Sequence, residues 1–385
     1  MKILIVHNQL WAHYKAIIFN ELQRIFSRQP QDSLLVVQIA SIEKSRKDLG
    51  DLDDSIHQYP YKLLYDGLLE EVSLSQRIQG ILKAIIEFKP DVVNLTGYYD
   101  VASWTVLMYC KLQGIKVILS NESTANDHNR NSLKEYAKSL IIKQFDGYFN
   151  FGSLSENYIL SLGIDAQKML VKRNCVDNQA LKKIYLKHRV ARNEQQSLRK
   201  IARHNFIFVG RLIEYKNLFH FLDAFNMAQR LSTYDDWGVI MLGDGALKKD
   251  LQTFVAEKNI PNVSFQTGVS WQQVPKYLAL SDVLVLPSYS EPWGLVVNEA
   301  MACGLPVVVS DKCGCSVDLV KDGINGFLFS PNDVHQLKDI LLKFMDNGVD
   351  SQQMGLISEQ IIQEFSPEKV AFEMFTGFQK VYKQK

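Results

Sequence analysis

Short runs rich in Val, Ile and Leu alternate along this chain with longer stretches in which apolar residues recur at helical spacing. This alternation is typical of parallel sheets whose strands are joined by crossover helices. The sequence therefore predicts an α/β protein with two such modules. The expected strands span residues 3–6, 34–39, 92–95, 116–119 and 147–151 in the first module, and 206–209, 238–242, 263–265, 283–286 and 307–309 in the second.

The chain has 385 residues, enough for two domains of about 150 residues, each with its own core. We predict an N-terminal domain of residues 1–180, a basic linker of residues 181–204, a second domain of residues 205–365 and a C-terminal helical segment of residues 366–385. The expected helices within the domains span residues 11–26, 74–88, 101–112, 132–144, 218–230, 246–258 and 274–279.

The predicted linker has an unusual charge balance, because eight basic residues face a single acid, Glu194. We favour a solvated linker with a polar helix, since runs of charge usually only keep a surface wet. Docking on an anionic membrane is the alternative, because each basic residue near such a surface contributes ~1 kcal/mol. The eight residues are Lys182, Lys183, Lys187, Arg189, Arg192, Arg199, Lys200 and Arg203.

Composition excludes several classes of protein. The formal net charge of +1 argues against a nucleic-acid partner for the chain as a whole. Five cysteines without C-x-x-C spacing argue against a zinc site and against a disulfide framework. No apolar run approaches the ~18 residues of a membrane span, and the first residues predict a strand rather than a signal peptide. We expect a reduced, cytoplasmic protein, with peripheral membrane contact as the alternative.

Two carboxylates bracket a predicted strand-to-helix turn in Glu291-Pro-Trp-Gly-Leu-Val-Val-Asn-Glu299. Ligands of open parallel sheets bind beyond the carboxyl ends of the strands, so both acids should border a crevice and could hold a polyol from two sides. N–H groups near Gly294 and Leu295, at the start of the helix, favour an anion such as a phosphate. The alternative is that Glu291 is an ordinary helix-dipole partner and Glu299 a surface residue.

A second candidate element follows the expected strand 206–209 and reads Gly210-Arg-Leu-Ile-Glu-Tyr-Lys-Asn217. Arg211 can bind two phosphate oxygens with its planar guanidinium, and Lys216 adds a compact charge. Together these cations could offset the charge of a departing diphosphate. The alternative is that both are surface cations on a loop.

The run of residues 281–331 resembles the donor-binding core of the family-4 retaining glycosyltransferases, within the glycosyl transferases group 1. The family signature of two Glu residues separated by seven others is matched by Glu291 and Glu299. The resemblance is strong from about residue 206 to residue 331 and loose over residues 1–175. Matching segments around the signature are Ser281-Asp-Val-Leu-Val-Leu-Pro-Ser, Glu299-Ala-Met-Ala-Cys-Gly-Leu-Pro and Gly323-Ile-Asn-Gly-Phe-Leu.

The resemblance implies the GT-B fold, with two Rossmann-like doubly wound domains, an interdomain cleft and a C-terminal helix that packs back on the first domain. It implies transfer of a sugar, with retention, from a nucleoside-diphosphate sugar to an acceptor hydroxyl. A saccharide, a lipid-linked saccharide or a small molecule could serve as acceptor, and polysaccharide or glycolipid biosynthesis is the expected setting. An epimerase or a phosphorylase of the same fold, and a natural-product glycosyltransferase, remain as alternatives.

Individual roles also follow from the resemblance. Arg211 and Lys216 match the phosphate-binding pair of the family, and Glu299 matches the residue that accepts hydrogen bonds from the ribose hydroxyls. Glu291 is then the catalytic carboxylate beside the donor sugar. The backbone of Val269 matches a position that meets the nucleotide base.

Trp293 stands where relatives commonly have Phe, so it should line the sugar pocket; a core aromatic at a helix start is the equal alternative. No cofactor is expected, and no metal is needed, because the two cations and the helix N–H groups take its place. Asp51-Leu-Asp53 does spell D-x-D, but it lies in a hydrophilic stretch and is interpreted as solvated surface.

The N-terminal domain departs from the family pattern in two places. No glycine occurs in the loop after the first strand, Asn8-Gln-Leu-Trp-Ala-His-Tyr-Lys15. His13 and Tyr14 of this loop are candidates for the acceptor side. The alternative for His13 is a packed or solvated side chain, which is common for a His at a helix start. After the strand 116–119 the chain has Asn121 and Glu122 where many relatives have a His, which in this chain comes only at His128. Asn121 is a candidate acceptor-side residue. Glu122 could act as a catalytic base or hydroxyl acceptor, with helix capping as the alternative.

Overall fold

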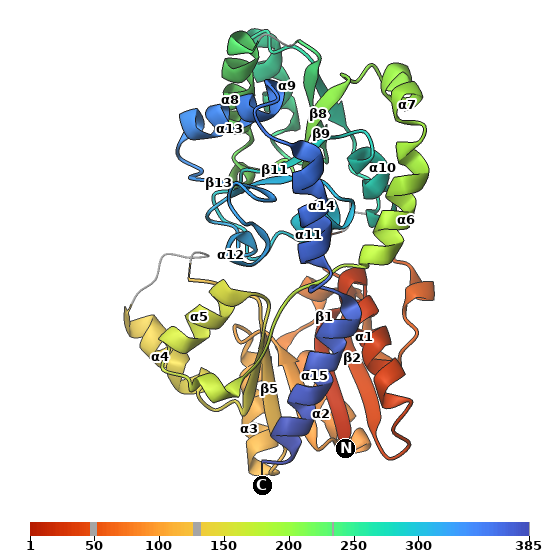
Figure 1. Ribbon diagram of the computed structural model, residues 1–385. Helices are drawn as coiled ribbons and strands as arrows, with labels where there is room; N and C mark the ends of the chain where they lie inside the picture. Colours follow the sequence, from red (N-terminus) through yellow and green to blue (C-terminus); the bar gives the residue numbers. More distant parts are fainter. Residues whose placement is uncertain (47–51, 126–131, 233–234, 385) are drawn as a thin grey trace. The chain divides into compact units, whose positions relative to one another are not determined.

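The computed structural model describes residues 1–46, 52–125, 132–232 and 235–384. The chain divides into two compact units (Figure 1): unit 1 contains Met1–Val176 and Ser366–Lys385, and unit 2 contains Asp177–Phe365. Each unit is built around one sheet in which every pairing is parallel, with seven strands in unit 1 and six in unit 2. The predicted α/β class with two Rossmann-like units is therefore confirmed.

The strand order of unit 1 is β3-β2-β1-β4-β5-β6-β7. From β1 the chain moves outward in one direction to β3, then returns to the other side of β1 and proceeds to β7. The order thus reverses between β1 and β4, the position where ligands of such sheets bind. The strands are β1 (Lys2–Gln9), β2 (Ser33–Ile42), β3 (Tyr61–Leu68), β4 (Val92–Thr96), β5 (Lys116–Asn121), β6 (Gly147–Asn150) and β7 (Met169–Lys172).

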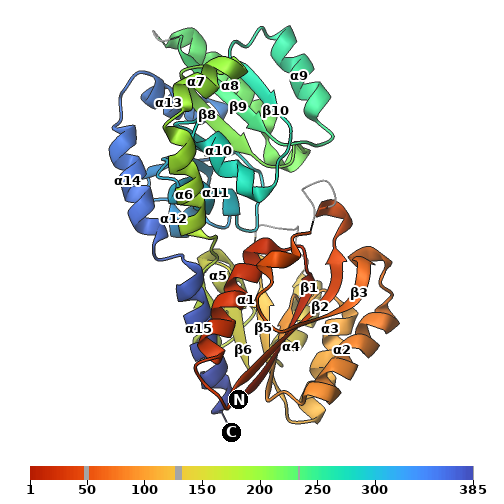
Figure 2. The same ribbon diagram turned by 90° about the vertical axis from the view of Figure 1, so that its right-hand side faces the viewer.

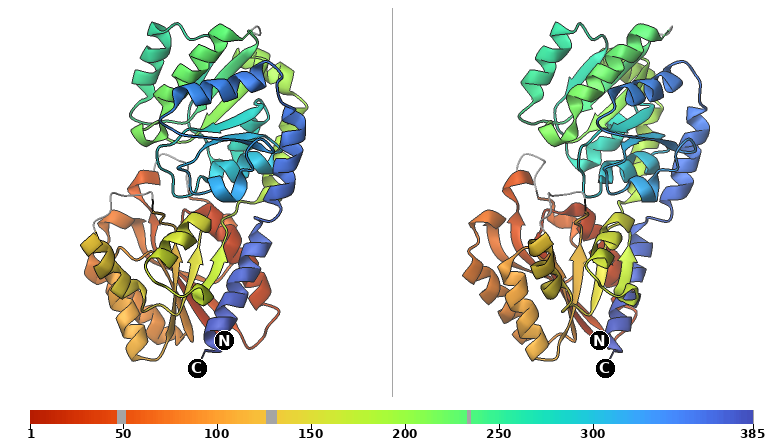
Figure 3. Two further views of the ribbon diagram at one scale, coloured as in Figure 1. Left: turned by 60° about the vertical axis from the view of Figure 1, so that its left-hand side comes forward. Right: turned by 90° about the vertical axis from the view of Figure 1, so that its left-hand side faces the viewer.

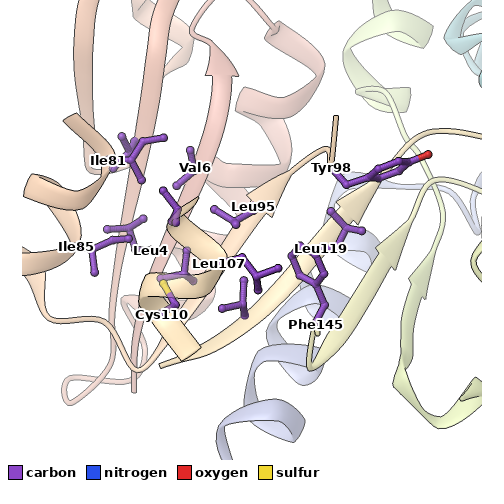
Figure 4. Packing of buried hydrophobic residues seen from close by; sticks show 14 of the residues in the cluster. Leu4, Val6, Ile81, Ile85, Leu95, Tyr98, Leu107, Cys110, Leu119 and Phe145 are labelled. Carbon is purple, nitrogen blue, oxygen red and sulfur yellow. The ribbon is translucent and has the colours of Figure 1, made fainter. Parts of the chain in front are cut away.

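Helices cover both faces of this sheet, as Figure 2 shows. Alternate residues of β1 point to opposite faces, so Ile3 and Ile5 join the core beneath α1 and α15, whereas Leu4 and Val6 join the core beneath α2 to α5 (Figure 4). The helices of unit 1 are α1 (His13–Phe26), α2 (Leu74–Phe88), α3 (Val101–Leu112), α4 (Ser132–Ile142), α5 (Ser153–Ser161) and α15 (Pro367–Tyr382).

The C-terminal helix α15 runs along unit 1 in both views of Figure 3, where it is dark blue. Its Phe375 ring packs on Phe26 of α1, with 5.3 Å between ring centroids, and its Phe378 ring packs on Phe149 of β6 at 5.1 Å. With 16 residues, α15 is the longest described helix, and none of the described helices is long and apolar enough to cross a bilayer.

Unit 2 has the strand order β10-β9-β8-β11-β12-β13, so its order reverses between β8 and β11. The strands are β8 (His204–Val209), β9 (Trp237–Leu242), β10 (Val263–Gln266), β11 (Val283–Leu286), β12 (Val307–Ser310) and β13 (Gly326–Phe329). The helices are α6 (Asn178–Arg189), α7 (Arg192–Arg199), α8 (Leu218–Leu231), α9 (Lys248–Glu257), α10 (Val274–Leu278), α11 (Leu295–Ala302), α12 (Ser316–Leu319), α13 (Val334–Met345) and α14 (Ser351–Ile362).

Residues 181–204, predicted to be a linker, form most of α6, all of α7 and the start of β8, and they belong to unit 2. The reason is that one side of α6 is apolar, since Leu181 and Tyr185 are buried. On α7, the guanidinium of Arg192 donates to both carboxylate oxygens of Asp282, at 2.8 and 2.5 Å. Part of the basic run is therefore internal structure rather than solvated surface.

Glycine determines how the loops after β8 and β9 meet. A Cβ atom on Gly243 would lie 1.9 Å from the carbonyl oxygen of Gly210, and one on Gly245 would lie 2.4 Å from that of Leu212. Both contacts are shorter than any side chain tolerates. The two loops therefore pack backbone against backbone, which keeps the segment after β8 in place.

We expect Gly243→Ala to destabilise unit 2 by about 2–4 kcal/mol, because the new methyl group must push two backbone segments apart. Urea unfolding monitored by tryptophan fluorescence measures the loss. Gly348→Ala is the matched control, since a Cβ there meets its nearest atom at 3.3 Å and the residue is exposed. Equal unfolding free energies for the two variants would contradict this account of the loops.

Candidate active site

Lys216 and Glu291 form an ion pair at the point where the strand order of unit 2 reverses. Lys216 follows β8 and Glu291 follows β11, and these strands are neighbours in the sheet. Both side chains are largely buried, with 15% and 19% of their surface exposed. The structure thus brings together two residues that sequence analysis assigned to different parts of one site, 75 positions apart.

The backbone of the Glu291 segment is held by the loop after β12. The carbonyl of Glu291 accepts from the N–H of Gly314 at 2.8 Å, and that of Trp293 accepts from Cys315 at 3.1 Å. A Cβ on Gly314 would lie 1.8 Å from the carbonyl oxygen of Pro292, so only glycine fits. This support was not predicted from the sequence, in which a glycine shortly after a predicted strand was the available signal.

Helix α11 begins immediately after this turn, and Gly294 makes the start possible. Its φ is +99°, and a Cβ there would lie 2.8 Å from a methyl group of Leu286. Gly294, the N-cap residue, has no side chain that could accept from the first N–H groups of the helix, and the N–H of Val297 donates to the Gly294 carbonyl at 2.9 Å. An anion placed there would meet the N–H groups of Leu295 and Val296 at the positive end of the helix dipole.

Glu299 lies one turn into α11 and is half-buried. Burial raises the pKa of its carboxyl to about 8. Among the described residues no cation or hydrogen-bond donor reaches this carboxyl. A group of this kind is ready to accept hydrogen bonds from a ligand, because nothing in the protein satisfies it.

Trp293 lies in the core. Its side chain is 4% exposed, its indole N–H donates to the side-chain oxygen of Asn298 at 2.8 Å, and its ring packs on Phe365 at 6.3 Å. The contacts fit a core aromatic at the helix start. The expectation that Trp293 lines the sugar pocket is not met, because the indole N–H and the ring face are already used inside unit 2.

Arg211 is exposed, and its loop is tied to those after β9 and β10 through Asp244. The N–H of Leu212 donates to the carbonyl of Asp244 at 2.9 Å, and the N–H of Gly268 donates to the Asp244 carboxylate at 2.6 Å. Val269, half-buried, follows directly. Asp244 was not singled out in the sequence, although its flanking glycines were the signal for a tight turn.

In unit 1, Lys15 of α1 and Glu122, which follows β5, form an ion pair of 2.8 Å. Lys15 is buried, with its ammonium nitrogen 3.4 Å from the centroid of the Phe151 ring, whereas 44% of the Glu122 side chain is exposed. Burial works against the charged carboxylate, but the Lys15 ammonium outweighs it and lowers the pKa of Glu122. Glu122 is thus held as an anion that faces solvent.

The other candidates of unit 1 are already engaged in packing. Asn121 is buried, and its amide donates to Ser155 at 2.8 Å. His13 packs edge-on against Tyr14 with 5.6 Å between ring centroids. Burial, followed by the charge of Arg46, lowers the pKa of His13 to about 3, and burial raises the pKa of Tyr14. Asn121 is therefore a positioning residue for its loop, and His13 is neutral at physiological pH.

His7, at the end of β1, was not singled out in the sequence. Its Nδ1 lies 3.0 Å from both the Gln9 carbonyl and the Gln38 side-chain oxygen, so Nδ1 carries the proton. Burial, followed by the Lys15 charge, lowers the pKa of His7 to about 4. A polar residue at the end of a predicted strand was the only signal for it.

The D-x-D sequence and His128 fall partly or wholly outside the described residues. Asp51 and His128 lie outside them, and the carboxylate of Asp53 accepts from the N–H of Ser55 at 3.1 Å, as a turn cap does. Within the described ranges, no three His, Cys, Asp or Glu side chains gather closely enough to hold a metal ion.

A known protein family matches a part of the chain that lies within unit 2. Residues 191–360 match the family model described as Glycosyl transferases group 1. This part of the chain, under half of its length, is similar to that family. The matched range includes both segments of the candidate site, from Arg211 to Glu299, which explains why the sequence resemblance was strongest there.

Curated relatives align over part of the chain. An Escherichia coli UDP-Gal:alpha-D-GlcNAc-diphosphoundecaprenol alpha-1,3-galactosyltransferase is 32% identical over 199 residues, which cover 50% of this chain and 49% of the relative. The amylovoran biosynthesis glycosyltransferase AmsK of Erwinia amylovora is 26% identical over 275 residues, covering 68% and 64%. The chain thus spans about half the length of the first and under two thirds of the second.

The fold has close counterparts among solved structures. HepE from Anabaena, solved in complex with UDP, superposes with a TM-score of 0.75 at 18% identity, covering 99% of this chain and 100% of HepE. At this identity the likeness concerns the fold. The predicted GT-B fold, with its two Rossmann-like domains, is confirmed.

We expect Glu299→Gln to stabilise the protein at high pH. The folded carboxyl ionises near pH 8, against about 4.3 when unfolded, so the wild-type protein loses stability as the pH rises between these values, and the neutral amide does not. Because the side chain keeps some contact with water, the gain at pH 9 should be about 1–3 kcal/mol, with little difference at pH 5.

Urea unfolding at the two pH values measures this effect. Glu257→Gln, at an exposed position of α9, is the control and should leave the pH dependence unchanged. A Glu299→Gln variant whose stability differs from the wild type by the same amount at pH 5 and pH 9 would show that burial does not hold the proton on this carboxyl.

Proposed function

We propose that this protein is a retaining glycosyltransferase that moves a sugar from a nucleoside-diphosphate sugar to an acceptor hydroxyl. The observation that carries the proposal is the meeting of Lys216 and Glu291 beside the uncapped start of α11, at the strand-order reversal of unit 2. Cations, helix N–H groups and a carboxylate at this position suit a sugar diphosphate.

In this proposal, four kinds of contact bind the nucleoside-diphosphate sugar. Arg211 and Lys216 bind the diphosphate oxygens, and the first N–H groups of α11, beginning at Leu295, add neutral donors. Glu299 accepts from the ribose hydroxyls, for which its unsatisfied carboxyl is suited. The backbone at Val269 meets the base. No metal or other cofactor is required, because these cations and N–H groups neutralise the diphosphate.

The reaction follows from where charge develops. As the bond between the anomeric carbon and the diphosphate oxygen breaks, negative charge grows on that oxygen and is stabilised by Arg211, Lys216 and the helix N–H groups. The acceptor oxygen attacks from the same face, and its proton passes to the departing diphosphate. Glu291 supports the positive anomeric centre, so its role is electrostatic and no covalent intermediate on the enzyme is needed.

The Lys216–Glu291 ion pair explains why the donor would have to bind before Glu291 can act on the sugar. With no diphosphate bound, Lys216 is neutralised by Glu291. A diphosphate competes for the lysine with more negative charge and several oxygens. Donor binding then releases Glu291 from its partner and leaves the carboxylate beside the sugar, where its charge is required.

The names of relatives support a setting in polysaccharide or glycolipid biosynthesis, since one acts on a diphosphoundecaprenol-linked sugar and one belongs to amylovoran biosynthesis. They also support a UDP-sugar donor, since the first of these uses UDP-Gal and HepE was solved with UDP. The acceptor is then a saccharide, free or lipid-linked. An epimerase would turn over the donor without an acceptor, and a phosphorylase would need only orthophosphate. A natural-product glycosyltransferase would accept a small molecule without a sugar.

Peripheral membrane contact through α6 forms part of the proposal. On its outward face Lys183, Leu186 and Lys187 are exposed, Leu186 by 51%, and Val190, which follows the helix, is 91% exposed. Among the described residues, neither lysine has an acidic partner. Cations alternating with apolar side chains suit the headgroup region of an anionic bilayer.

A nucleotide panel tests the donor site. We expect one of UDP, GDP, ADP, CMP and dTDP, with UDP favoured, to raise the melting temperature by roughly 5–10 °C at a hundred times its Kd. Lys216→Ala and Glu299→Ala should lose most of the shift, whereas Glu291→Ala should keep it and lower turnover instead. Lys249→Ala, at an exposed position of α9, is the control for charge.

No shift with any nucleotide, or an equal shift in Lys216→Ala, would contradict a diphosphate site between β8 and β11. A Glu291→Ala variant with wild-type turnover would contradict the catalytic role of that carboxylate while leaving the binding site intact.

Vesicle sedimentation tests the membrane contact. The protein should bind phosphatidylcholine vesicles only when they contain phosphatidylglycerol, and Lys183→Glu with Lys187→Glu should weaken binding roughly thirtyfold, at ~1 kcal/mol for each lysine. The control reverses Lys249 and Lys258 of the α9 region. Equal binding of the two double variants would contradict a docking role for α6.

A further inference from the structure

A cavity of about 210 Å³ lies in unit 2 between the C-terminal ends of α6, α7 and α10. Figure 1 shows the three helices near one another, and α10 packs on α6. The cavity is separate from the candidate active site, because Leu280 in its wall precedes β11 whereas Glu291 follows that strand. It is lined by His188, Gln195, Arg199, Gln273, Lys276, Tyr277 and Leu280.

The lining carries positive charge and contains no acid among the described residues. Each of the three helices contributes one basic residue, and within the described ranges His188, Arg199 and Lys276 have no acidic partner. Burial, followed by the charges of Lys276 and Lys187, lowers the pKa of His188. Neighbouring positive charge thus opposes protonation of this imidazole, and an anion in the cavity would relieve the repulsion.

The carbonyl groups that follow α10 already have other donors. Cations are common in the last turn of a helix because they bind its final carbonyls and complement its dipole. Here the guanidinium of Arg189 donates to the carbonyl of Ala279 at 2.8 Å. The side-chain amide of Gln196 donates to the carbonyl of Leu280 at 2.9 Å. These contacts fix the wall of the cavity without Lys276, whose ammonium is therefore not needed at the helix end.

Arg199 is oriented by an aromatic neighbour that also lines the cavity. Its guanidinium carbon lies 5.2 Å from the centroid of the Tyr277 ring, and one of its N–H groups donates to the Tyr277 hydroxyl at 3.3 Å. The other N–H groups of the planar guanidinium stay available, and the side-chain amides of Gln195 and Gln273 add neutral donors. Cations combined with neutral donors suit the several oxygens of a phosphate group.

We propose that the cavity between α6, α7 and α10 binds a phosphate group, with Arg199, Lys276 and His188 as its cationic contacts. One water takes roughly 30 Å³, so a cavity of about 210 Å³ holds a phosphate and the first atoms of the group that it esterifies. The carrier is an anionic phospholipid, because Lys187 acts on His188 and also belongs to the α6 face proposed to contact a membrane. Only this choice of carrier rests on the proposed function; the phosphate site does not.

NMR of the full chain, labelled with ¹³C at histidine, tests the site through the His188 signal, which His188→Gln assigns. Inorganic phosphate should shift this signal saturably and raise the pKa of His188, because an adjacent anion favours the imidazolium. Sodium chloride at equal ionic strength is the reference. Arg199→Gln with Lys276→Gln should raise the Kd of phosphate roughly tenfold or more. The matched control is Lys249→Gln with Lys258→Gln, two exposed lysines of the α9 region.

A second probe distinguishes the two sources of the phosphate group. Dihexanoylphosphatidylglycerol, used as a monomer, should shift the His188 signal at lower concentration than inorganic phosphate does. Arg199→Gln with Lys276→Gln should also weaken sedimentation with phosphatidylglycerol vesicles roughly tenfold. A response to inorganic phosphate and glycerol 3-phosphate, but not to the lipid, would keep the site and overturn the phospholipid as its carrier.

The inference is overturned if the His188 signal follows ionic strength alone, or if the double variant and its control bind phosphate equally. Thermal unfolding of both shows whether a loss of binding reflects loss of the fold. Because His188 lies outside the donor site, a saturable phosphate response without any nucleotide response would keep this site and contradict the transferase. A nucleotide response without a His188 response would do the reverse.

Discussion

Every strand pairing in the two sheets is parallel, and the rest of the molecule depends on this constraint. Parallel neighbours cannot be joined by hairpins, so each connection crosses a face of the sheet and the carboxyl ends of all strands meet at one edge. The charged residues of the candidate sites lie beyond those ends. They are Lys216 and Glu291 in unit 2 and Lys15 and Glu122 in unit 1. Their convergence from distant positions is a result of strand direction.

Each unit places a lysine and a glutamate together at that edge, but the two pairs differ in what they expose. In unit 2 both partners are largely buried, so the pair is closed and its charges are available only to a ligand that separates them. In unit 1 the lysine is buried and the glutamate half exposed, so the lysine acts as a fixed counter-charge behind an accessible carboxylate. The pair in unit 2 suits a lysine that exchanges its glutamate for a ligand, and the pair in unit 1 suits a lysine that keeps the Glu122 carboxylate in one orientation.

Sequence patterns predicted the fold class and most strands, since buried parallel strands are continuous apolar runs such as Val283–Leu286. They missed β3, β7 and β13, of which β3 is only partly buried at the sheet edge. They also misjudged α6, whose buried side rests on Leu181 and Tyr185 amid many charges. The E-x₇-E segment and Arg211 were visible from spacing and resemblance. The supporting contacts of Gly314 and Asp244, and the buried indole of Trp293, depend on tertiary packing that no local pattern records.

Unit 1 is assembled from two separate stretches of chain, and unit 2 lies between them in the sequence. During synthesis, residues 177–365 therefore leave the ribosome before α15 is made. Until then, Phe26 of α1 and Phe149 of β6 lack the contacts that Phe375 and Phe378 provide. All of the second unit can therefore be synthesised while the first still exposes aromatic side chains that α15 later covers.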